Sequence, residues 1–313
     1  MKIRRRAVID VGTNSIKLLI GEVSAGLVRP LDERSEQTRL GAGLYETHEL
    51  QAVPIARTAS AVAGFVARAR DAGAESVRVI ATSAARDARN ADELLQAIHR
   101  AAGLRVEIIT GDQEAEWVFR GVTSDPDLHG RQLLILDVGG GSTEFILGEH
   151  GHLSFRQSFP MGSVRLLEHL RPGDPPSLAD LAGCRQWLQN FFNRQIGPAL
   201  ESKLQVAAQH PLTLVGTGGT TTILARMEKK LTTFQREAIE GTRLGQRQIL
   251  EDMVHLWSLS LAVRKKIPGI PPNRSDVILM GVAIYEALMR HFNFPELYVS
   301  TRGLRFGALL ASP

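Results

Sequence analysis

The 313-residue chain contains a single cysteine, few aromatic residues (5%) and no long apolar run. One cysteine, Cys184, cannot form an internal disulfide, so the chain is not a disulfide-stabilised scaffold, and we expect a cytoplasmic protein. The basic residues at 1–6 precede only three apolar residues before Asp10, which does not fit a signal peptide. The longest apolar stretch, 277–285, is too short to cross a bilayer. We therefore expect a soluble protein without a membrane partner.

Several enzyme classes are excluded because their motifs are missing. The sequence has no G-x-G-x-x-G, P-loop, H-E-x-x-H, C-x-x-C or G-x-S-x-G pattern. These absences argue against a dinucleotide-binding fold, a P-loop NTPase, a zinc enzyme and a serine hydrolase. The remaining composition, 43% hydrophobic and 22% charged, is that of a globular protein of about two domains.

The net charge of +4 arises entirely from the second part of the chain. Residues 1–125 carry 17 basic and 17 acidic side chains, whereas 126–313 carry 20 and 16. Ten of those basic residues lie between Arg226 and Arg274. They either bind a phosphorylated polyanion, because arginine matches phosphate geometry, or form a solvated surface. A nucleic-acid partner is not expected, because the region offers few aromatic rings for stacking.

Apolar runs alternate with amphipathic segments along the chain. Residues 77–121 read as strand, helix, strand, helix, which predicts parallel pairing in a layered α/β domain. Asn90 is expected to begin one helix and Gly103 to end it. The expected strands are 6–12, 16–23, 77–82, 104–109, 133–138, 143–148 and 152–158, and the expected helices 54–72, 90–102, 112–121, 177–206, 218–230, 246–258 and 276–291.

An internal repeat is the most informative feature of the sequence. Residues 8–22 (VIDVGTNSIKLLIGE) and 135–149 (ILDVGGGSTEFILGE) share six of fifteen positions. Each copy is an apolar strand ending in Asp, a turn with Gly and Ser, and a second apolar strand, which is typical of a β-hairpin. Two copies predict two related domains that face each other across a cleft.

Both turns, and a third glycine cluster, are candidate phosphate-binding sites. Glycine permits the positive φ of an anion-binding nest and lets a phosphate approach the backbone, while Ser and Thr add hydroxyl donors. The third cluster leads from a strand into a helix, whose N-terminal N–H groups bind anions. A plain tight turn is the alternative at each place. The candidate residues are Gly12, Thr13, Asn14, Ser15, Gly139, Gly140, Gly141, Ser142, Gly218, Gly219 and Thr220.

Acidic residues stand next to these turns. Asp10 and Asp137 end equivalent strands, and Glu144 lies two residues beyond Ser142. Carboxylates repel phosphate unless a cation intervenes, and Mg²⁺ binds one or two carboxylates together with phosphate oxygens. These three acids are the candidate metal ligands. The alternative for either aspartate is to accept hydrogen bonds from its own turn.

Glu114 and Arg86 follow two further strands at the sheet edge where open α/β folds bind ligands. Glu114 would orient or deprotonate an attacking water, or would simply complement the dipole of its helix. Arg86 would clamp a phosphate, or would pair with Asp87 or Glu93.

Taken together, these segments resemble the exopolyphosphatase/guanosine pentaphosphate phosphatase (Ppx/GppA) family of the actin-like superfamily. The blocks that carry the resemblance run in order along the chain: AVIDVGTNS, LGAGL, ATSAARDARN, GDQEAEWVFRGV, LLILDVGGGSTEF, MGSVRLLEHL, VGTGGTTTILA, PNRSDVILMG and RGLRFG. The resemblance implies two ribonuclease H-like α/β domains around a cleft, which we expect at 1–125 and 126–313, with the last helix packed back on the first domain.

The resemblance also implies a chemistry. Glu114 is similar to the family's catalytic base, Asp137 and Glu144 to the acids of its phosphate and metal site, and Gly139 to Ser142 to the residues that hold the terminal phosphate. Asp10, Thr13, Asn14, Ser15 and Arg86 match substrate-facing positions. The expected reaction is Mg²⁺-dependent release of orthophosphate from polyphosphate or, alternatively, from guanosine pentaphosphate. A homodimer is expected only by analogy with the family.

Two departures and two rival functions accompany this interpretation. The chain stops at Pro313 and has no His-Asp dipeptide, so it resembles the short, two-domain form of the family. Phe306 stands where the family often has Glu. The rivals are an ATPase or sugar kinase of the same superfamily, and a non-catalytic sensor that binds an alarmone or polyphosphate. A sensor has no need of Glu114, Asp137 and Glu144 together, which disfavours it.

Overall fold

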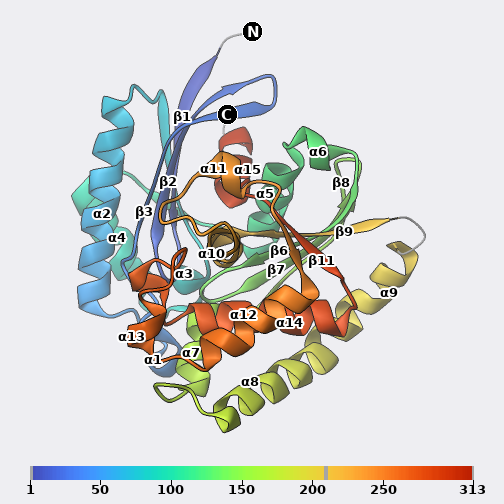
Figure 1. Ribbon diagram of the computed structural model, residues 1–313. Helices are drawn as coiled ribbons and strands as arrows, with labels where there is room; N and C mark the ends of the chain where they lie inside the picture. Colours follow the sequence, from blue (N-terminus) through green and yellow to red (C-terminus); the bar gives the residue numbers. More distant parts are fainter. Residues whose placement is uncertain (1–2, 208–210, 312–313) are drawn as a thin grey trace.

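Two mixed β-sheets stand side by side in a computed structural model that describes residues 3–207 and 211–311 (Figure 1). The five-stranded sheet has the order β3-β2-β1-β4-β5, and the six-stranded sheet the order β10-β11-β9-β6-β7-β8. The strands are β1 (Arg4–Val11), β2 (Ile16–Ser24), β3 (Leu27–Glu36), β4 (Ser76–Ala81), β5 (Val106–Ile108), β6 (Gln132–Val138), β7 (Thr143–Glu149), β8 (His152–Phe159), β9 (Leu212–Thr217), β10 (Arg243–Gly245) and β11 (Glu296–Val299).

The two sheets share one topology. β1 pairs antiparallel with β2 and parallel with β4, and β6 pairs antiparallel with β7 and parallel with β9. The repeat of 8–22 and 135–149 is therefore a repeated hairpin, and the expectation of two related α/β domains is confirmed. The expected strands are present within a residue or two at most ends. β3, β10 and β11 were not predicted, because β3 is a polar edge strand containing Pro30 and the other two are short.

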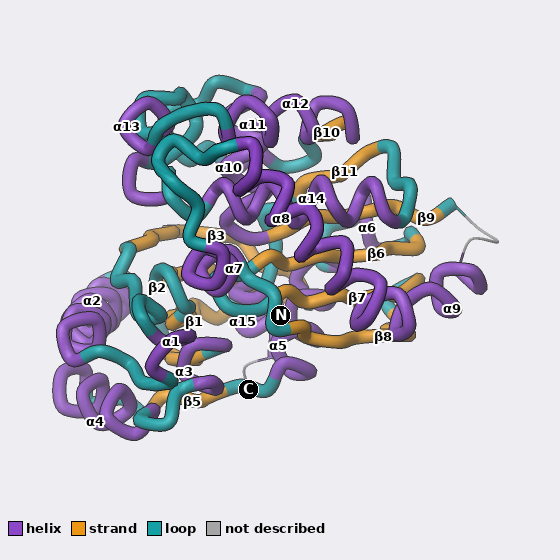
Figure 2. The backbone as a smooth tube through the Cα atoms, turned by 90° about the horizontal axis from the view of Figure 1, so that it is seen from below, coloured by secondary structure: helices purple, strands orange, loops and turns teal. Residues whose placement is uncertain are grey.

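Long helices cover the outer face of each sheet (Figures 1 and 2). α2 (Ala52–Asp71) and α4 (Ala91–Ala102) pack on the first sheet. The second sheet is covered by α8 (Leu178–Phe191), a π-helical segment (Phe192–Ile196), α9 (Gly197–Ala207), α12 (Gln246–Trp257) and α14 (Ile278–His291). The remaining helices are α1 (Leu44–Thr47), α3 (Ser83–Asp87), α5 (Gly111–Thr123), α6 (Pro126–His129), α7 (Ser163–Leu170), α10 (Gly218–Glu228), α11 (Arg236–Ile239), α13 (Leu261–Arg264), a 3₁₀ turn (Pro272–Arg274) and α15 (Leu304–Ala311).

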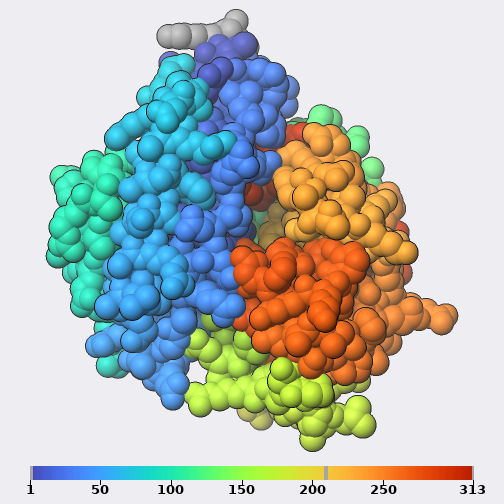
Figure 3. All heavy atoms as spheres, turned by 60° about the vertical axis from the view of Figure 1, so that its left-hand side comes forward, coloured from blue at the N-terminus to red at the C-terminus, as the bar shows by residue number. Residues whose placement is uncertain are grey.

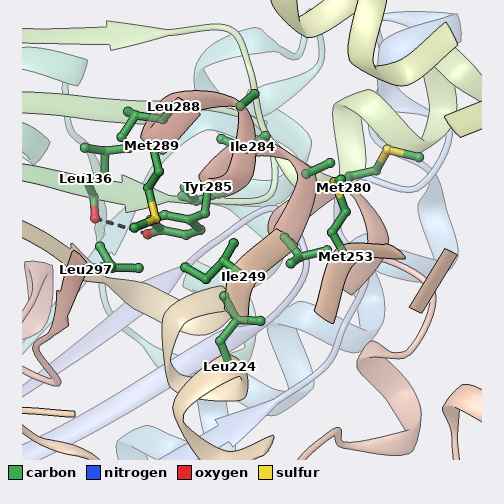
Figure 4. Close-up of a cluster of buried hydrophobic side chains, with 14 of the residues drawn as sticks. Leu136, Leu224, Ile249, Met253, Met280, Ile284, Tyr285, Leu288, Met289 and Leu297 are labelled. Carbon is green, nitrogen blue, oxygen red and sulfur yellow. Dashed lines mark hydrogen bonds between the residues drawn. The ribbon is translucent and has the colours of Figure 1, made fainter. Parts of the chain in front are cut away.

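The core of the second domain is organised around α14, which is buried on nearly all sides. Figure 4 shows Tyr285 of this helix among aliphatic side chains, with its hydroxyl donating to the carbonyl of Leu136 at 3.4 Å. Because the helix is apolar all round, its segment contains the longest apolar stretch of the sequence, 277–285. No helix in the described part of the chain is long and apolar enough to span a membrane.

A third apolar core joins the two domains. α5 and α15 lie between the sheets (Figure 1) and pack together closely, because a Cβ on Gly307 would lie 1.7 Å from the carbonyl oxygen of Trp117. α15 also reaches the first sheet, where Arg6 donates to the carbonyl of Leu309 at 3.2 Å. The boundary at residue 125 stays a prediction.

The helix bounds at Asn90 and Gly103 are confirmed, but the role of Asn90 differs from the expected one. Its side chain makes no hydrogen bond to the helix that it begins. Instead its Oδ1 accepts from the N–H of Leu50 at 2.8 Å, which ties the loop before α2 to α4. Asn90 therefore stabilises a contact between segments distant in sequence and does not cap its helix through its side chain.

Candidate active site

The two repeated turns have the same geometry. The N–H of Gly12 donates to the carbonyl of Ser15 at 3.2 Å, and the N–H of Gly139 donates to the carbonyl of Ser142 at 2.9 Å. Asp10 lies opposite Lys17 in the first hairpin, and Asp137 opposite Glu144 in the second. The same local hydrogen-bond pattern therefore presents an aspartate and a short polar turn from each domain.

Both turns line one cavity of about 290 Å³ between the domains. Figure 3 shows the entrance as a hollow between the blue first domain and the orange part of the second. Apart from Arg86, every candidate site residue lines this cavity: Asp10, Gly12, Thr13, Asn14, Ser15, Glu114, Asp137, Gly139, Gly140, Gly141, Ser142, Glu144, Gly218, Gly219 and Thr220.

The glycines of the turns serve close approach and not positive φ. Positive φ was predicted for the glycines of the two hairpin turns, and none of Gly12, Gly139, Gly140 and Gly141 has it, so that prediction was wrong. Instead, a Cβ on Gly140 would lie 2.9 Å from Cβ of Thr13, and one on Gly141 would lie 2.0 Å from the Tyr45 hydroxyl. The glycines let the turn of one domain touch the other domain across the cavity.

Asp10 and Asp137 are close enough for the charge of one to affect the other. Burial raises the pKa of Asp10 and raises that of Asp137 to about 6, and the Asp10 charge contributes to the latter. A Cβ on Gly218 would lie 2.3 Å from Oδ1 of Asp137, so this carboxylate sits directly against the start of α10. Both carboxylates are therefore held where their negative charge is costly.

The residues present fit a divalent cation that is completed by other oxygens. Oδ1 of Asp10 is buried without a hydrogen-bond partner, and a neighbouring aspartate shares its surroundings. No group of three His, Cys, Asp or Glu side chains suited to a metal occurs among residues 3–207 and 211–311. Two carboxylates, with substrate and water oxygens, match the preference of Mg²⁺.

Glu144 is held by two serines. The hydroxyls of Ser142 and Ser158 both donate to its Oε1 at 2.7 Å. The side chain is 1% exposed, and burial, followed by the charge of Asp137, raises its pKa to about 7. The two hydroxyl donors fix this carboxylate at the cavity wall.

Glu114 and Arg86 form an ion pair beside Glu144. Glu114 projects from the first turn of α5, and its Oε2 accepts from Nη1 of Arg86 at 2.7 Å. Burial, then the charge of Glu144, raises the pKa of Glu114 well above its ordinary value, while Arg86 opposes this. Of the alternative partners of Arg86, Asp87 instead pairs with Arg165 at 2.5 Å. A carboxylate with a raised pKa, aimed into a cavity, is suited to accept a proton.

Five cationic residues that line the cavity were not among the candidate site residues: Lys17, Arg34, Arg226, Arg274 and Arg305. Lys17 lies on β2 beside both aspartates, and burial lowers its pKa. Arg274 donates to the Ser15 hydroxyl, and Arg305 donates to the Leu18 carbonyl at 2.9 Å. Lys17 had a detectable signal, because it occupies the repeat position of Glu144. Arg274 belongs to the basic stretch for which polyanion binding was one interpretation, whereas Arg305 gave no signal, because its segment approaches the site only in the folded chain.

Most of the basic stretch 226–274 does not face the cavity. Among its described basic side chains, only Arg226 and Arg274 line the cavity, and Arg226 donates to the carbonyl of Thr232 at 2.7 Å. Arg236 pairs with Glu33 of the first domain, at 2.5 Å. The guanidinium of Arg236 also lies 4.7 Å from the ring of Phe306, which is buried at the domain interface.

The duplicated sheets, with a turn and an aspartate from each facing one cavity, define a two-domain α/β protein of the actin-like class. Residues 19–312 match the Ppx/GppA phosphatase family, and the chain belongs to this family. Its resemblance to that family is thereby confirmed.

Two curated relatives and one solved structure show how far the similarity extends. Exopolyphosphatase 2 of Mycobacterium tuberculosis is 34% identical over 299 residues, covering 93% of this chain and 91% of the relative. The guanosine-5'-triphosphate,3'-diphosphate pyrophosphatase of Aeromonas salmonicida is 28% identical, covering 97% of this chain and 58% of the relative. The Ppx/GppA enzyme of Aquifex aeolicus has a TM-score of 0.79 and 30% identity, covering 99% and 100% of the two chains.

Proposed function

We propose that the chain is a phosphoanhydride hydrolase that releases terminal orthophosphate from inorganic polyphosphate with the help of Mg²⁺ or another divalent cation. One observation carries this proposal: the paired turns and aspartates of both domains face the same cavity as a buried carboxylate, Glu114. The 34% identity to an exopolyphosphatase over nearly the whole chain supports polyphosphate as the substrate.

In the proposed reaction, some residues of the cavity bind the phosphate and others accept the proton of the attacking water. N–H and hydroxyl donors of residues 12–15 and 139–142 hold the oxygens of the terminal phosphate, and Lys17 and Arg274 add positive charge. Glu114, held by Arg86, orients the attacking water and accepts its proton. A cation held by Asp10 and Asp137 would offset the charge of the leaving phosphate chain. Positioning and electrostatics of this kind supply most of the acceleration in phosphoryl transfer.

Guanosine pentaphosphate is the second candidate substrate, and one side chain favours it. Phe234 lines the cavity and is 43% exposed. The Arg236 guanidinium lies 5.7 Å from its ring, and the adjoining loop is held by Arg226. An exposed ring at the cavity can stack on a nucleobase, whereas a bare polyphosphate offers it no partner.

Orthophosphate release with Mg²⁺ from long-chain polyphosphate, guanosine pentaphosphate and ATP, measured in parallel, tests the proposal. Release concentrated on polyphosphate supports it, and release concentrated on guanosine pentaphosphate supports the second candidate. Transfer from ATP to an acceptor other than water would identify a kinase. Saturable binding of polyphosphate or the pentaphosphate without release, with any divalent cation, would overturn the hydrolase proposal and leave the sensor.

A further inference from the structure

A second, shallow depression borders the same acidic side chains from outside the cavity. It is lined by Arg86, Thr110, Gly111, Asp112, Gln157 and Ser158. These residues belong to α3, to the start of α5 and to the end of β8. None of them lines the cavity between the domains. The depression is therefore a separate opening to solvent next to the proposed catalytic groups.

Single side-chain contacts connect the depression to the cavity. Arg86 lines the depression, and its Nη1 lies 2.7 Å from Oε2 of Glu114, which lines the cavity. Ser158 lines the depression, and its hydroxyl donates at 2.7 Å to Glu144, which lines the cavity. At both places one pair of side chains in contact reaches from the depression to the cavity, and we call these two pairs the wall. Arg86 also donates to the Ile109 carbonyl at 3.0 Å and to the Ser142 hydroxyl at 3.5 Å, so opening a path here requires its 19% exposed side chain to exchange these contacts for solvent or for the anion.

The in-line geometry of phosphoryl transfer determines on which side of this wall the orthophosphate forms. In phosphoryl transfer the attacking water and the leaving group lie roughly in line, on opposite sides of the phosphorus. With Glu114 orienting the water, the leaving phosphate chain points away from the wall, towards the entrance between the domains. The new orthophosphate is then enclosed between the wall and the shortened chain. Orthophosphate could leave by the entrance only after the shortened polyphosphate had left.

We propose that orthophosphate leaves through this wall into the depression, guided by the guanidinium of Arg86. The inference rests on the proposed hydrolase function. It adds a route for the product that allows the polyphosphate to remain bound between cleavages. Arg86 lines the depression, and its Nη2 also reaches a cavity residue, donating to the Ser142 hydroxyl at 3.5 Å. Asp112, the acid at the depression, is directed towards Arg156 at 3.4 Å.

An obstruction placed at the rim of the depression tests the route without altering the wall. Asp112 is suited to it, because its side chain is 67% exposed and pairs with Arg156, which does not line the cavity. Asp112→Trp would place an indole over the depression. The matched control is Glu116→Trp, one turn further along α5, where the indole lies outside the depression.

Bond cleavage and phosphate release are measured separately on long-chain polyphosphate. Acid-quenched single-turnover mixing gives the cleavage rate, and a fluorescent phosphate-binding protein reports free orthophosphate. For Asp112→Trp we expect an unchanged cleavage rate and a delay before release that lengthens about tenfold. The Glu116→Trp protein should match the wild type in both. An unchanged delay in the Asp112→Trp protein, with cleavage intact, would overturn the route and leave the hydrolase function standing.

Product inhibition of the wild type gives a second, independent test. If orthophosphate enters from the depression, it binds while polyphosphate occupies the entrance, and the inhibition is noncompetitive with polyphosphate. If the entrance is the only route, added orthophosphate competes with polyphosphate, which would also refute the proposal. Absence of any phosphate release from the three substrates would instead refute the hydrolase function, and the route with it.

Discussion

The ionised carboxylate of Glu144 should destabilise the folded protein at neutral pH. Replacing this residue should show how large its effect on the free energy of unfolding is. Its pKa rises from 4.5 to about 7 on folding, so the folded state holds the proton more tightly than the unfolded state. Stability contributed by the protonated form is therefore lost as pH rises from about 4.5 to beyond 7. At about 1.4 kcal/mol for each tenfold change, the ionised carboxylate costs about 3 kcal/mol at pH 7.5 and less than about 0.5 kcal/mol at pH 4.5.

Glu144→Gln removes this cost, because the amide oxygen can still accept from Ser142 and Ser158. We expect the variant to be more stable than the wild type by about 3 kcal/mol at pH 7.5, which corresponds to roughly 6 °C in Tm. At pH 4.5 the two proteins should nearly coincide. Urea denaturation in EDTA without phosphate measures both differences. Asp71→Asn, at an exposed residue ending α2, is the control and should change stability by less than about 0.5 kcal/mol at either pH.

A destabilised Glu144→Gln protein at pH 7.5, or a gain of equal size at both pH values, would refute the reasoning. Reduced phosphate release from the stabilised variant would show that the carboxylate is kept for its function, at the expense of stability.

Three further substitutions address the site. Glu114→Gln should retain polyphosphate binding in calorimetry but lose about 10² to 10⁴ in turnover, and near wild-type turnover would disprove its role as base. Gly141→Ala should raise KM and lower Tm, because the new methyl would meet the Tyr45 hydroxyl at 2.0 Å; unchanged values would show that the domains can separate without cost. Phe234→Ala should raise KM for guanosine pentaphosphate about tenfold while leaving polyphosphate unaffected, and equal effects on both would exclude a stacking role.

The sequence was sufficient for those parts of the site that the repeat encodes. The two hairpins, their aspartates and the facing turns follow from one duplicated pattern, and the structure brings these residues to one cavity. Phosphate binding and metal binding at these positions remain predictions. Periodicity also located α2, α4, α12 and α14, because each buries one face or all of its surface.

The remaining features depend on contacts between distant segments. Glu33 and Arg236, 203 positions apart, pair across the domain interface, and nothing local to either residue indicates the other. β3 was missed because an edge strand needs an apolar pattern on only one face, and its sequence is mostly polar. The apolar pattern of α15 does not reveal that the helix fills the space between the two sheets.

One substitution within the repeat accounts for the asymmetry of the site. Lys17 and Glu144 occupy the same hairpin position, each opposite the aspartate that the two repeats share. The first domain thereby places a cation beside Asp10, and the second places a carboxylate near Asp137 and Glu114. Two hairpins with the same backbone thus divide the charge that they bring to the cavity, with a lysine on one and a glutamate at the equivalent place on the other. Because the scaffold is duplicated, that division requires only a change of side chain and no change of fold.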